Sequence, residues 1–434
     1  MSNAENITRK IFASALDAAD PAKAVERQCE RIRSVYRYGS FSRLLVIGFG
    51  KASVPMARAM EENLGDLITG GAVVTKYEHG SRHGLTNICV HEAGHPIPDE
   101  NGLNGTEALL ELANIADEKT LVVVLISGGG SALFVSPFQG IALEEKQETT
   151  SLLLKAGAEI HELNTVRKHI SRVKGGRLAE ILRPALSVSL ILSDVIGDSL
   201  DVIASGPTSP DSTTFADALY ILVKYDLAER APMSVINLLE KGLRGLVPDT
   251  PKKGSPIFHK VENVIIGSNR LALDAAKRSA DAMGMRSEIL SAEISGEAAQ
   301  AGRKLAAKAL AAKRGKGNGS PVCLVSGGET TVTVTGAGIG GRNMELALAF
   351  AAEIEGIHGI TLLSAGTDGT DGPTDAAGAI VDGMTVTRAK SLGLDPDEYL
   401  RNNDSYNFFL KCGGLFVTGP TGTNVMDIQI VVIE

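Results

Sequence analysis

The sequence is poor in several kinds of residue, and each shortage excludes a class of protein. It contains no tryptophan, and aromatic residues make up only 4% of its 434 positions. Basic residues are outnumbered, 43 against 51 acidic ones, which argues against a nucleic-acid partner or a polybasic membrane contact. The four cysteines are far apart and form no CxxC pair, so a disulfide framework or a structural zinc site is not expected. No run approaches about 18 apolar residues, and the N-terminus lacks a signal-peptide core, so we expect a soluble, cytoplasmic protein.

Glycine, in contrast, is abundant. The chain has 48 glycines, or about 11%, against an average usage of roughly 7%. They show no collagen-like period and stand mostly where apolar runs end, so we interpret them as turn and ligand-loop residues. An apolar content of 44% with 22% charge is typical of a globular protein, and the length predicts two or three domains.

Short apolar runs alternate with amphipathic stretches along most of the chain. Their continuous hydrophobicity predicts strands that are buried on both faces, as in a parallel sheet covered by helices. The runs are 44–48, 71–75, 87–90, 121–127, 187–193, 264–267, 322–326 and 361–366. Helical periodicity occupies the first forty residues, with a break at Pro21, and the stretches 105–117, 143–162, 174–183, 269–283, 297–313 and 343–355. The pattern predicts an α/β fold.

The C-terminal half differs from this pattern. The stretches 330–336 and 408–434 alternate apolar with polar residues, which predicts antiparallel strands with one wetter face and hence a mixed sheet. Residues 242–261 concentrate proline, glycine and lysine, as an interdomain crossing would. We therefore expect a Rossmann-like N-terminal domain over 1–241 and a C-terminal domain over 262–434.

Five apolar runs end directly in a cluster of glycine, serine or aspartate. Ligands bind at the carboxyl ends of strands in α/β sheets, so these loops are candidate site loops, although tight turns alone would also explain them. The five loops span 47–53, 126–134, 192–198, 326–330 and 364–372, and the loop GAGIGGRN at 336–343 is a sixth.

Charged residues in these loops narrow the chemistry. Lys51 stands at a strand-to-helix turn, where a point charge suits a phosphate or carboxylate, and Arg342 opens a helix with a planar fork that suits a phosphoryl group. The carboxylates Asp194, Asp198, Glu329, Asp368 and Asp371 could hold Mg²⁺ or accept a hydroxyl proton. Together they fit phosphoryl transfer; each could instead form a surface ion pair or cap a turn.

A basic run at 164–180 stands out in an acidic chain. It contains Arg167, Lys168, His169, Arg172, Lys174 and Arg177. One interpretation is a solvated helix face. The other is a cationic wall that faces an acidic substrate, with Lys174, just before Gly175 and Gly176, as its most loop-like member.

Three motifs match known patterns but lack the required context. His91–His95 reads HExxH, yet a strand-like run precedes it and Gly94 and Pro96 oppose a helix; His79 and His83 share its spacing and the same interpretation. Residues 336–341 satisfy GxGxxG but follow no buried strand, and the strand after Gly48 ends at Lys76 without the acid that binds NAD. A Walker A loop is absent because Ala52 follows Gly50-Lys51.

The loops and runs taken together resemble one family. The segments VIGFGKAS, EAGHPIPD, LISGGGSAL, NTVRKHISRVKGGRLA, ILSDVIGDSLDVIASGPTSPD, SGGETTVTVTGAGIGGRNMELALA, SAGTDGTDGPTDAAGA and TGTNVMDI look like the glycerate 2-kinases with a C-terminal MOFRL domain. Members of this family have also been labelled hydroxypyruvate reductases. The resemblance runs from about residue 5 to the end of the chain.

The resemblance implies two α/β domains around a cleft, with a mixed-sheet MOFRL domain, and ATP-dependent phosphorylation of D-glycerate at its 2-hydroxyl with Mg²⁺ or a similar ion. Lys51 and Arg342 match the family's catalytic basic residues, and Asp194, Glu329 and Asp368 its acidic positions. Which acid is the base and which holds metal stays open, with Asp194 and Asp368 as the candidate metal ligands.

On this basis the phosphates would lie against the glycine loops, and Lys174 and Arg342 would hold the glycerate carboxylate. The loop residues are Gly48, Gly50, Ser127, Gly128, Gly129, Gly130, Ser131, Gly338, Gly340 and Gly341. The alternative is an NAD(P)H-dependent hydroxypyruvate reductase. The expected partners are the small substrate D-glycerate and a second copy of the chain in a homodimer.

Overall fold

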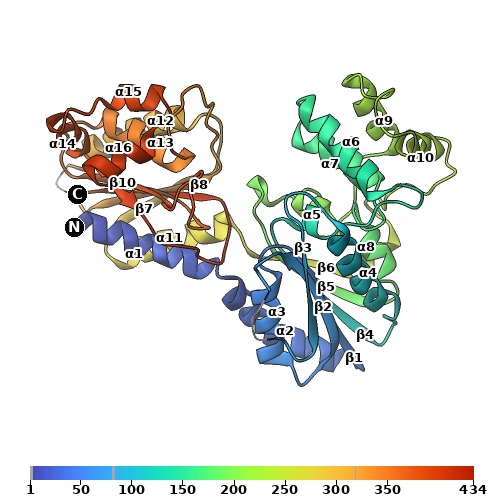
Figure 1. The fold of residues 1–434 in the computed structure, drawn as a ribbon. Coiled ribbons are helices and arrows are strands. Elements are labelled where there is room, and N and C mark those ends of the chain that lie inside the picture. The colour runs from blue at the N-terminus through green and yellow to red at the C-terminus, as the bar shows by residue number, and fades with distance from the viewer. Residues whose placement is uncertain (1–2, 81–83, 318) are drawn as a thin grey trace. The chain divides into compact units, whose positions relative to one another are not determined.

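The chain forms two compact units, each built on its own six-stranded sheet (Figure 1). The structure, a computed structural model, describes residues 3–80, 84–317 and 319–434, so His83 lies outside the described residues. The parallel-sheet unit comprises Pro21–Ser193 and Asp198–Ile266. The mixed-sheet unit comprises Asp194–Gly197, Gly267–Glu434 and the N-terminal segment that ends at Asp20. Each unit is described by itself.

The sheet of the parallel-sheet unit has the strand order β3-β2-β1-β4-β5-β6. Its first five strands pair in parallel, and this order is the one found in dinucleotide-binding folds. β4 is buried along its whole length, as expected for a central strand covered on both faces. The strands are β1 (Arg43–Phe49), β2 (Ile68–Lys76), β3 (Ile88–Ala93), β4 (Thr120–Ile126), β5 (Leu186–Leu192) and β6 (Val261–Gly267).

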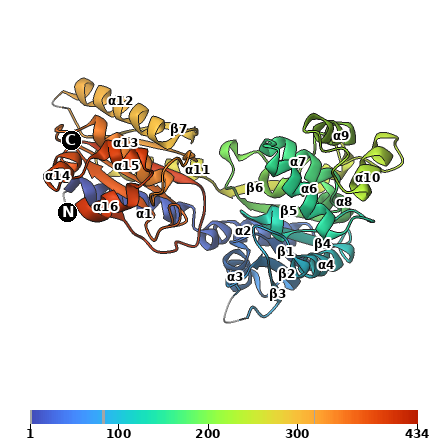
Figure 2. The ribbon, with the colours of Figure 1, turned by 45° about the horizontal axis from the view of Figure 1, so that its top comes forward.

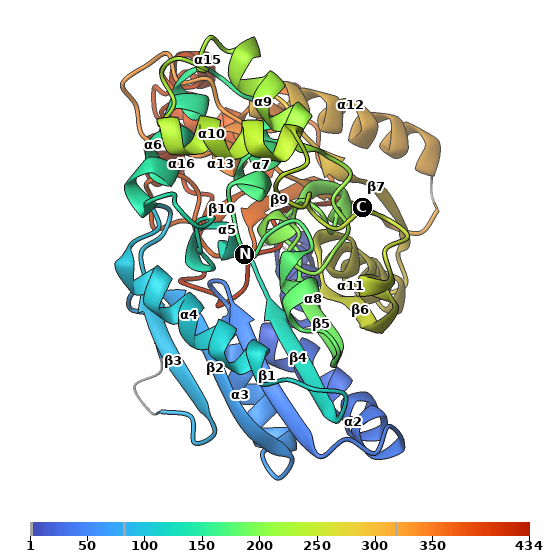
Figure 3. The same cartoon turned by 90° about the vertical axis from the view of Figure 1, so that its right-hand side faces the viewer.

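Helices cover both faces of this sheet. α4 (Glu100–Asn114) packs on β1, β2 and β3, while α3 (Ser53–Leu64) packs on β1, β2 and β4 from the other face (Figure 3). α2 (Pro21–Tyr38) lies against α3.

A separate helical cluster completes the parallel-sheet unit (Figure 2). Its core is apolar and includes Leu153, Val166, Phe215, Leu222 and Leu239, all of them fully buried or nearly so. The cluster contains α6 (Leu143–Lys155), α7 (Ile160–His169), α9 (Phe215–Lys224) and α10 (Met233–Leu243). Short elements join the cluster to the sheet: α5 (Gly130–Leu133), α8 (Arg177–Ile181), η2 (Ile203–Ser205) and η3 (Pro256–Lys260). The short helix η1 (Ile196–Asp198) lies where the chain returns from the mixed-sheet unit, to which Ile196 and Gly197 belong.

The mixed-sheet unit has the strand order β11-β10-β9-β12-β8-β7. β7 and β8 are parallel, and every other pair is antiparallel. α1 (Asn3–Ala18) and α11 (Asn269–Ala282) lie on one side of the sheet, with α12 (Ala298–Lys316) and α13 (Arg342–Glu353) on the other (Figure 1). The strands are β7 (Arg286–Ile294), β8 (Val322–Gly328), β9 (Ile360–Gly366), β10 (Gly378–Asp382), β11 (Leu415–Phe416) and β12 (Asp427–Ile433); α14 (Thr385–Ser391), α15 (Pro396–Arg401) and α16 (Ser405–Cys412) complete the unit.

All eight predicted apolar runs form strands, namely β1 to β6, β8 and β9. The prediction was wrong for 330–336, which forms no strand. No neighbouring strand lies beside that segment in the described chain. Its N–H groups at Thr333 and Thr335 are bound instead by the side chains of Glu297 and Asn403.

The stretch 408–434 divides into three parts. Its start is helical, in α16, and Leu415–Phe416 is a two-residue strand. β12 is antiparallel to both neighbours, as predicted. However, β12 is buried throughout, because a central strand between β8 and β9 has no wet face.

The unit boundary also differs from the predicted crossing at 242–261. That segment lies inside the parallel-sheet unit, where η3 leads into β6, and the chain passes to the other unit at Gly267. The N-terminal helix α1 belongs to the mixed-sheet unit because its apolar face packs on α11, β9 and β12. Within the described ranges, the helices are all too short or too polar to cross a membrane.

Candidate active site

Lys51 stands where β1 turns into α3 in the parallel-sheet unit. The neighbouring backbone amides are already used within the fold: Lys51 N–H donates to the Gly128 carbonyl at 2.8 Å and Ala52 N–H donates to Ser127 Oγ at 3.0 Å. The N–H of Gly50 likewise bonds the Val74 carbonyl. The half-buried Lys51 side chain, rather than this backbone, is therefore what the turn offers to an anion.

The two glycines before Lys51 serve close packing. A Cβ at Gly50, whose φ is +122°, would lie 2.3 Å from Ser127 Oγ. Gly48 lies inside the sheet between Val73 and Leu125, and a Cβ there would lie 2.9 Å from the Leu125 Cβ. Both positions explain why the β1 and β4 loops approach each other, and neither requires a phosphate.

The loop after β4 carries the remaining predicted phosphate residues of this unit. Ser127 is buried, whereas Ser131 bonds Ser205 Oγ at 2.9 Å, and Ser205 donates to Asn164 Oδ1 at 3.1 Å. Gly129 has φ +82°, and a Cβ on it would lie 3.2 Å from Lys51 Cγ and 3.0 Å from the His95 ring. Gly128–Ser131 and Lys51 are thus brought together with His95. Burial and the charges of Lys51 and Lys76 lower the pKa of His95 below its usual value.

The basic run at 164–180 is not a solvated helix face, so that interpretation was wrong. Lys168, His169, Lys174 and Arg177 are each less than 10% exposed. Lys168 pairs with the buried Asp211 at 3.1 Å. The fully buried Lys174 donates only to the Ala204 carbonyl, at 3.3 Å. Burial, together with the charges of Lys146 and Arg167, lowers the pKa of Lys174 well below its usual value.

A cavity of about 720 Å³ opens beside the β4 loop, wholly within the parallel-sheet unit. Gly129 and Ser131 form part of its lining, as does His95. Lys146 and Arg167 lie on its helical wall, from α6 and α7.

Arg342, in the mixed-sheet unit, interacts with three carboxylates. It forms ion pairs with Asp427 and Glu329, and the charge of Asp371 also acts on it. It is the first residue of α13, and its Nε and Nη2 donate to both oxygens of Asp427 at 2.7 and 2.9 Å. Nη1 lies 2.6 Å from Glu329 Oε1. Burial opposes the arginine charge, but the hydrogen bond and attraction from Asp427 and Glu329 raise the pKa of Arg342.

The two carboxylate partners differ in exposure. Asp427 is 1% exposed, whereas the Glu329 side chain is 45% exposed. Burial raises the pKa of both carboxyls, and the charges of Asp194 and Asp368 add to the rise at Glu329 and Asp427 respectively. The predicted residues Arg342, Glu329, Asp194 and Asp368 therefore lie in one electrostatic neighbourhood. The buried Asp427 fixes the arginine fork, and Glu329 is the partner that an incoming anion could displace.

Asp371 fixes the N-terminus of α13. Its carboxylate accepts the N–H groups of Asn343 at 3.0 Å and Met344 at 2.8 Å. Burial raises the pKa of Asp371 to about 7 despite these hydrogen bonds. Its role is thus a helix cap that holds Arg342 in place.

The loop of Gly338, Gly340 and Gly341 packs against its own unit. Gly338 N–H donates to the Asn402 carbonyl at 2.9 Å, and Ile339 N–H to Asp404 Oδ1 at 2.8 Å. A Cβ at Gly340 or Gly341 would lie within 2.4 Å of Ser405 or Asp371. The tight-turn interpretation therefore accounts for this loop, since it lets the chain before Arg342 lie close to α15 and α16.

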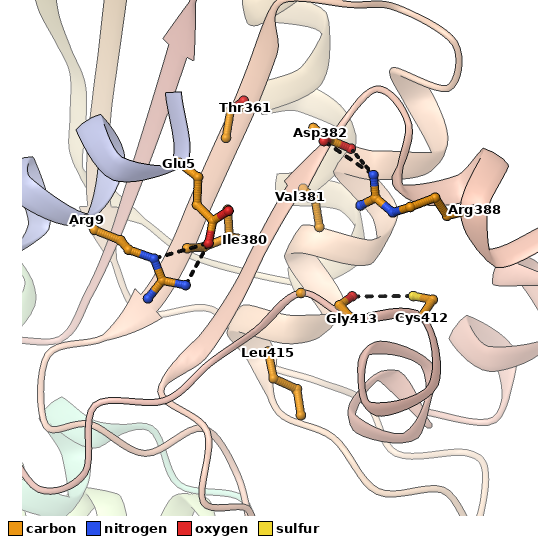
Figure 4. A pocket seen from close by; sticks show the side chains of 11 residues that line it. Glu5, Arg9, Thr361, Ile380, Val381, Asp382, Arg388, Cys412, Gly413 and Leu415 are labelled. Carbon is orange, nitrogen blue, oxygen red and sulfur yellow. Dashed lines mark hydrogen bonds and ion pairs between the residues drawn. The ribbon is translucent and has the colours of Figure 1, made fainter. Parts of the chain in front are cut away.

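A second cavity, of about 270 Å³, lies at the other end of the mixed sheet (Figure 4). Its cations are already neutralised, because Arg9 pairs with Glu5 at 2.8 Å and Arg388 with Asp382 at 3.2 Å. It offers no unpaired charge to a ligand.

The HExxH match lacks the helix that this zinc motif requires. His91 and Glu92 lie in strand β3, where consecutive side chains point to opposite faces. No group of three or more metal-ligating side chains occurs within 3–80, 84–317 and 319–434.

Sequence reasoning missed two residues of these neighbourhoods, Asp427 and Lys146. Asp427 begins the largely apolar strand DIQIVVI, in which it is the one charged residue, and an acid at that position was a usable signal. Lys146 lies in the polar stretch EEKQETT, where nothing distinguishes a buried lysine from an exposed one.

The protein is of the α/β class. One unit is built on a parallel sheet with the strand order of dinucleotide-binding folds, and the other on a mixed sheet. Residues 7–240 match a domain of unknown function, DUF4147, and residues 322–427 match the MOFRL family. The chain is 47% identical to a D-glycerate 2-kinase of Thermotoga maritima, over 97% of this chain and 96% of that protein, and 45% identical to a glycerate 2-kinase of Pyrococcus horikoshii, over 98% and 96%. The crystal structure of glycerate kinase from T. maritima matches with a TM-score of 0.90 and 46% identity, covering 99% of each chain. The chain belongs to the glycerate 2-kinase family with DUF4147 and MOFRL domains.

Proposed function

We propose that this protein transfers the γ-phosphoryl group of ATP to the 2-hydroxyl of D-glycerate, giving 2-phosphoglycerate and ADP. The observation that carries this proposal is the 47% identity, over nearly the whole of both chains, to a protein named D-glycerate 2-kinase. In the reaction the hydroxyl oxygen forms a bond to the γ-phosphorus, the bond to the β–γ bridging oxygen breaks, and the hydroxyl proton passes to a base.

Arg342 is proposed as a catalytic residue of this transfer. Its fork is oriented by the buried Asp427 and leaves Nη1 toward the more exposed Glu329. When a phosphoryl oxygen replaces Glu329 at Nη1, the guanidinium offsets the charge that develops in transfer. Glu329 acts in this proposal as the group that holds Nη1 before substrate arrives.

Lys51 is proposed as a second catalytic residue, with the parallel-sheet unit as its scaffold. Its backbone is fixed by Gly128, so the ammonium is delivered from a rigid turn. One of Asp194 and Asp368 is proposed to orient the 2-hydroxyl and accept its proton. Lys174 is proposed to bind a substrate anion, whose negative charge would oppose the burial that lowers the pKa of this lysine.

Mg²⁺ is proposed as the accompanying ion. Asp194 and Asp368 are its proposed ligands, since Mg²⁺ takes one or two carboxylates beside substrate phosphates and water. Bound there, the ion would neutralise phosphate charge. A homodimer stays a prediction, and light scattering of the purified chain measures it.

The deciding experiment incubates the protein with ATP and D-glycerate and identifies the product. Appearance of ADP with 2-phosphoglycerate supports the proposal, and 3-phosphoglycerate or no phosphorylated product contradicts it. The reductase alternative is tested in parallel by following NADH and NADPH absorbance with hydroxypyruvate. The strand order suits a dinucleotide, but β2 ends at Lys76 rather than at the acid that NAD requires, so no oxidation of NADH is expected. A lysine at this strand end leaves NADPH open, and the NADPH arm of the assay tests it.

A further inference from the structure

The cavity of the parallel-sheet unit has an unusual charge balance on its helical wall. Lys146 of α6 is 4% exposed, and Arg167 of α7 is half-buried. Within the described chain neither forms a hydrogen bond or ion pair with an acid. The buried Lys174 lies close enough for its charge to interact with both. Two basic side chains, Lys146 and Arg167, thus line the cavity without a carboxylate partner in the described chain, and the buried Lys174 lies near them outside the lining.

Such an arrangement is costly unless an anion completes it. Burial lowers the pKa of Lys146 to about 7, with a further contribution from Arg167, and burial also lowers the pKa of Arg167. The acids on the cavity lining, Glu144 and Glu148, are solvent-exposed residues of α6 and form no ion pair with these cations in the part of the chain that the structure describes. Buried charges are retained where they are paired, so an anionic ligand in the cavity would supply the partner that Lys146 and Arg167 lack.

Another part of the lining is apolar, and it includes Leu154 of the same helix, α6. Pro96, Ile97, Pro98 and Leu154 contribute to it, and Ile97 and Leu154 are 68% and 56% exposed. Large apolar side chains left exposed beside buried cations suit a ligand with a flat apolar group at one end and several negative charges at the other. The volume of about 720 Å³ lies in the range of cofactor-sized sites and exceeds what a three-carbon acid fills.

We infer that this cavity is the nucleotide site, with the triphosphate of ATP against Lys146 and Arg167 and the base against the apolar lining. The inference rests on the proposed function. It places the phosphate chain beside the β4 loop, because Gly129 and Ser131 line the same cavity. Lys51 then stands next to the phosphate chain, since its Cγ would lie 3.2 Å from a Cβ at Gly129.

The test compares Lys146→Met and Arg167→Met with Lys155→Met. Lys155 is the last residue of α6 and is exposed, so its variant controls for loss of one lysine on the same helix. ADP and ATP binding is measured by titration calorimetry, and KM is measured separately for ATP and for D-glycerate. We expect each cavity variant to weaken nucleotide binding about tenfold or more with little change in KM for D-glycerate, and Lys155→Met to behave as wild type.

Leu154→Ala is a second test of the inference. Leu154 lines the cavity and is exposed, so its removal should not prevent folding. The variant should raise KM for ATP several-fold without changing that for D-glycerate. If ADP affinity is unchanged in all cavity variants, or if KM rises for D-glycerate alone, the cavity holds the acid or neither substrate and the inference is wrong. A wild-type protein that binds ADP but does not phosphorylate D-glycerate would instead contradict the proposed function and leave the nucleotide site standing.

Discussion

At the scale of single residues, the most informative contact is the fork of Arg342 on Asp427. We expect Arg342→Ala to lower kcat by about two to three orders of magnitude, because one preorganised charge contact is worth ~3–4 kcal/mol of barrier. The same change leaves the buried Asp427 unpaired and lowers Tm.

Arg342→Lys keeps a charge beside Asp427 and separates the effect on turnover from the effect on stability. Arg388→Ala, which removes an arginine paired with an aspartate in the same unit, is the control. Turnover near wild type in a folded Arg342→Lys and Arg342→Ala pair would remove this residue from the mechanism.

Lys51 is expected to matter to turnover and little to stability. Its side chain is half-buried and its position is fixed by backbone hydrogen bonds that Lys51→Ala retains. We expect kcat to fall by about two to three orders of magnitude with Tm within a few degrees of wild type. Steady-state kinetics beside a thermal melt measure both quantities. A folded Lys51→Ala protein with normal kcat would contradict the assignment.

Lys146 carries a prediction about pH. Its pKa is about 7 in the folded chain, against about 10.4 in an unfolded one. Between these values the unfolded chain binds more protons, so this lysine's penalty on folding is full below pH 7 and fades as pH rises toward 10. Without nucleotide, Lys146→Met should therefore raise Tm by roughly 5 °C at pH 6 and by less at pH 9. An equal effect at both values would show that the lysine is not buried as a charge.

At the scale of elements, the β1–α3 turn depends on Gly50. Alanine there meets Ser127 Oγ at 2.3 Å and must adopt a φ of +122°, so Gly50→Ala should lower the free energy of unfolding by about 2 kcal/mol or more. Gly140→Ala has a similar positive φ with nothing within 4 Å of the added Cβ, and it isolates the backbone cost. Denaturant unfolding of the two variants measures the difference. Equal losses would mean that the close approach to Ser127 costs nothing.

Helices and strands were predictable where a single run of residues determines the local structure. Continuous burial identified β4 and its neighbours, and the breaker Pro21 separated α1 from α2. Predictions failed where a distant segment decides. The N–H groups of the loop before Arg342 looked available for phosphate, yet Asn402, Asn403 and Asp404 occupy those of Gly336, Gly338 and Ile339. The alternating Thr-Val stretch before that loop has no neighbouring strand to pair with.

Candidate site residues were likewise found from the sequence only where the signal is local. Lys51 and Arg342 could be selected because a charge beside glycine at a strand or helix end is visible locally. Lys146 could not, since its burial depends on how α6 meets α7.

At the scale of the whole molecule, the unit boundary does not follow the chain from end to end. α1 packs on α11, β9 and β12, and Thr423 Oγ1 donates to the Ala19 carbonyl at 2.6 Å. Deleting residues 1–20 should therefore destabilise the mixed-sheet unit and leave the parallel-sheet unit intact. Hydrogen exchange read peptide by peptide measures this, with faster exchange expected in β12 and α11 and unchanged exchange in β4. Faster exchange in β4 would contradict the assignment of α1.

The place of α1 also sets an order of events during synthesis. The ribosome makes this helix before every other element described here, whereas β12, on which it packs, comes after all of them. The parallel-sheet unit can collapse once its own strands have emerged, whereas the mixed-sheet unit waits until β12 has emerged. The apolar face of α1 therefore stays exposed on the nascent chain until β12 has been made. Slow elongation would lengthen the period in which this face can associate with other proteins.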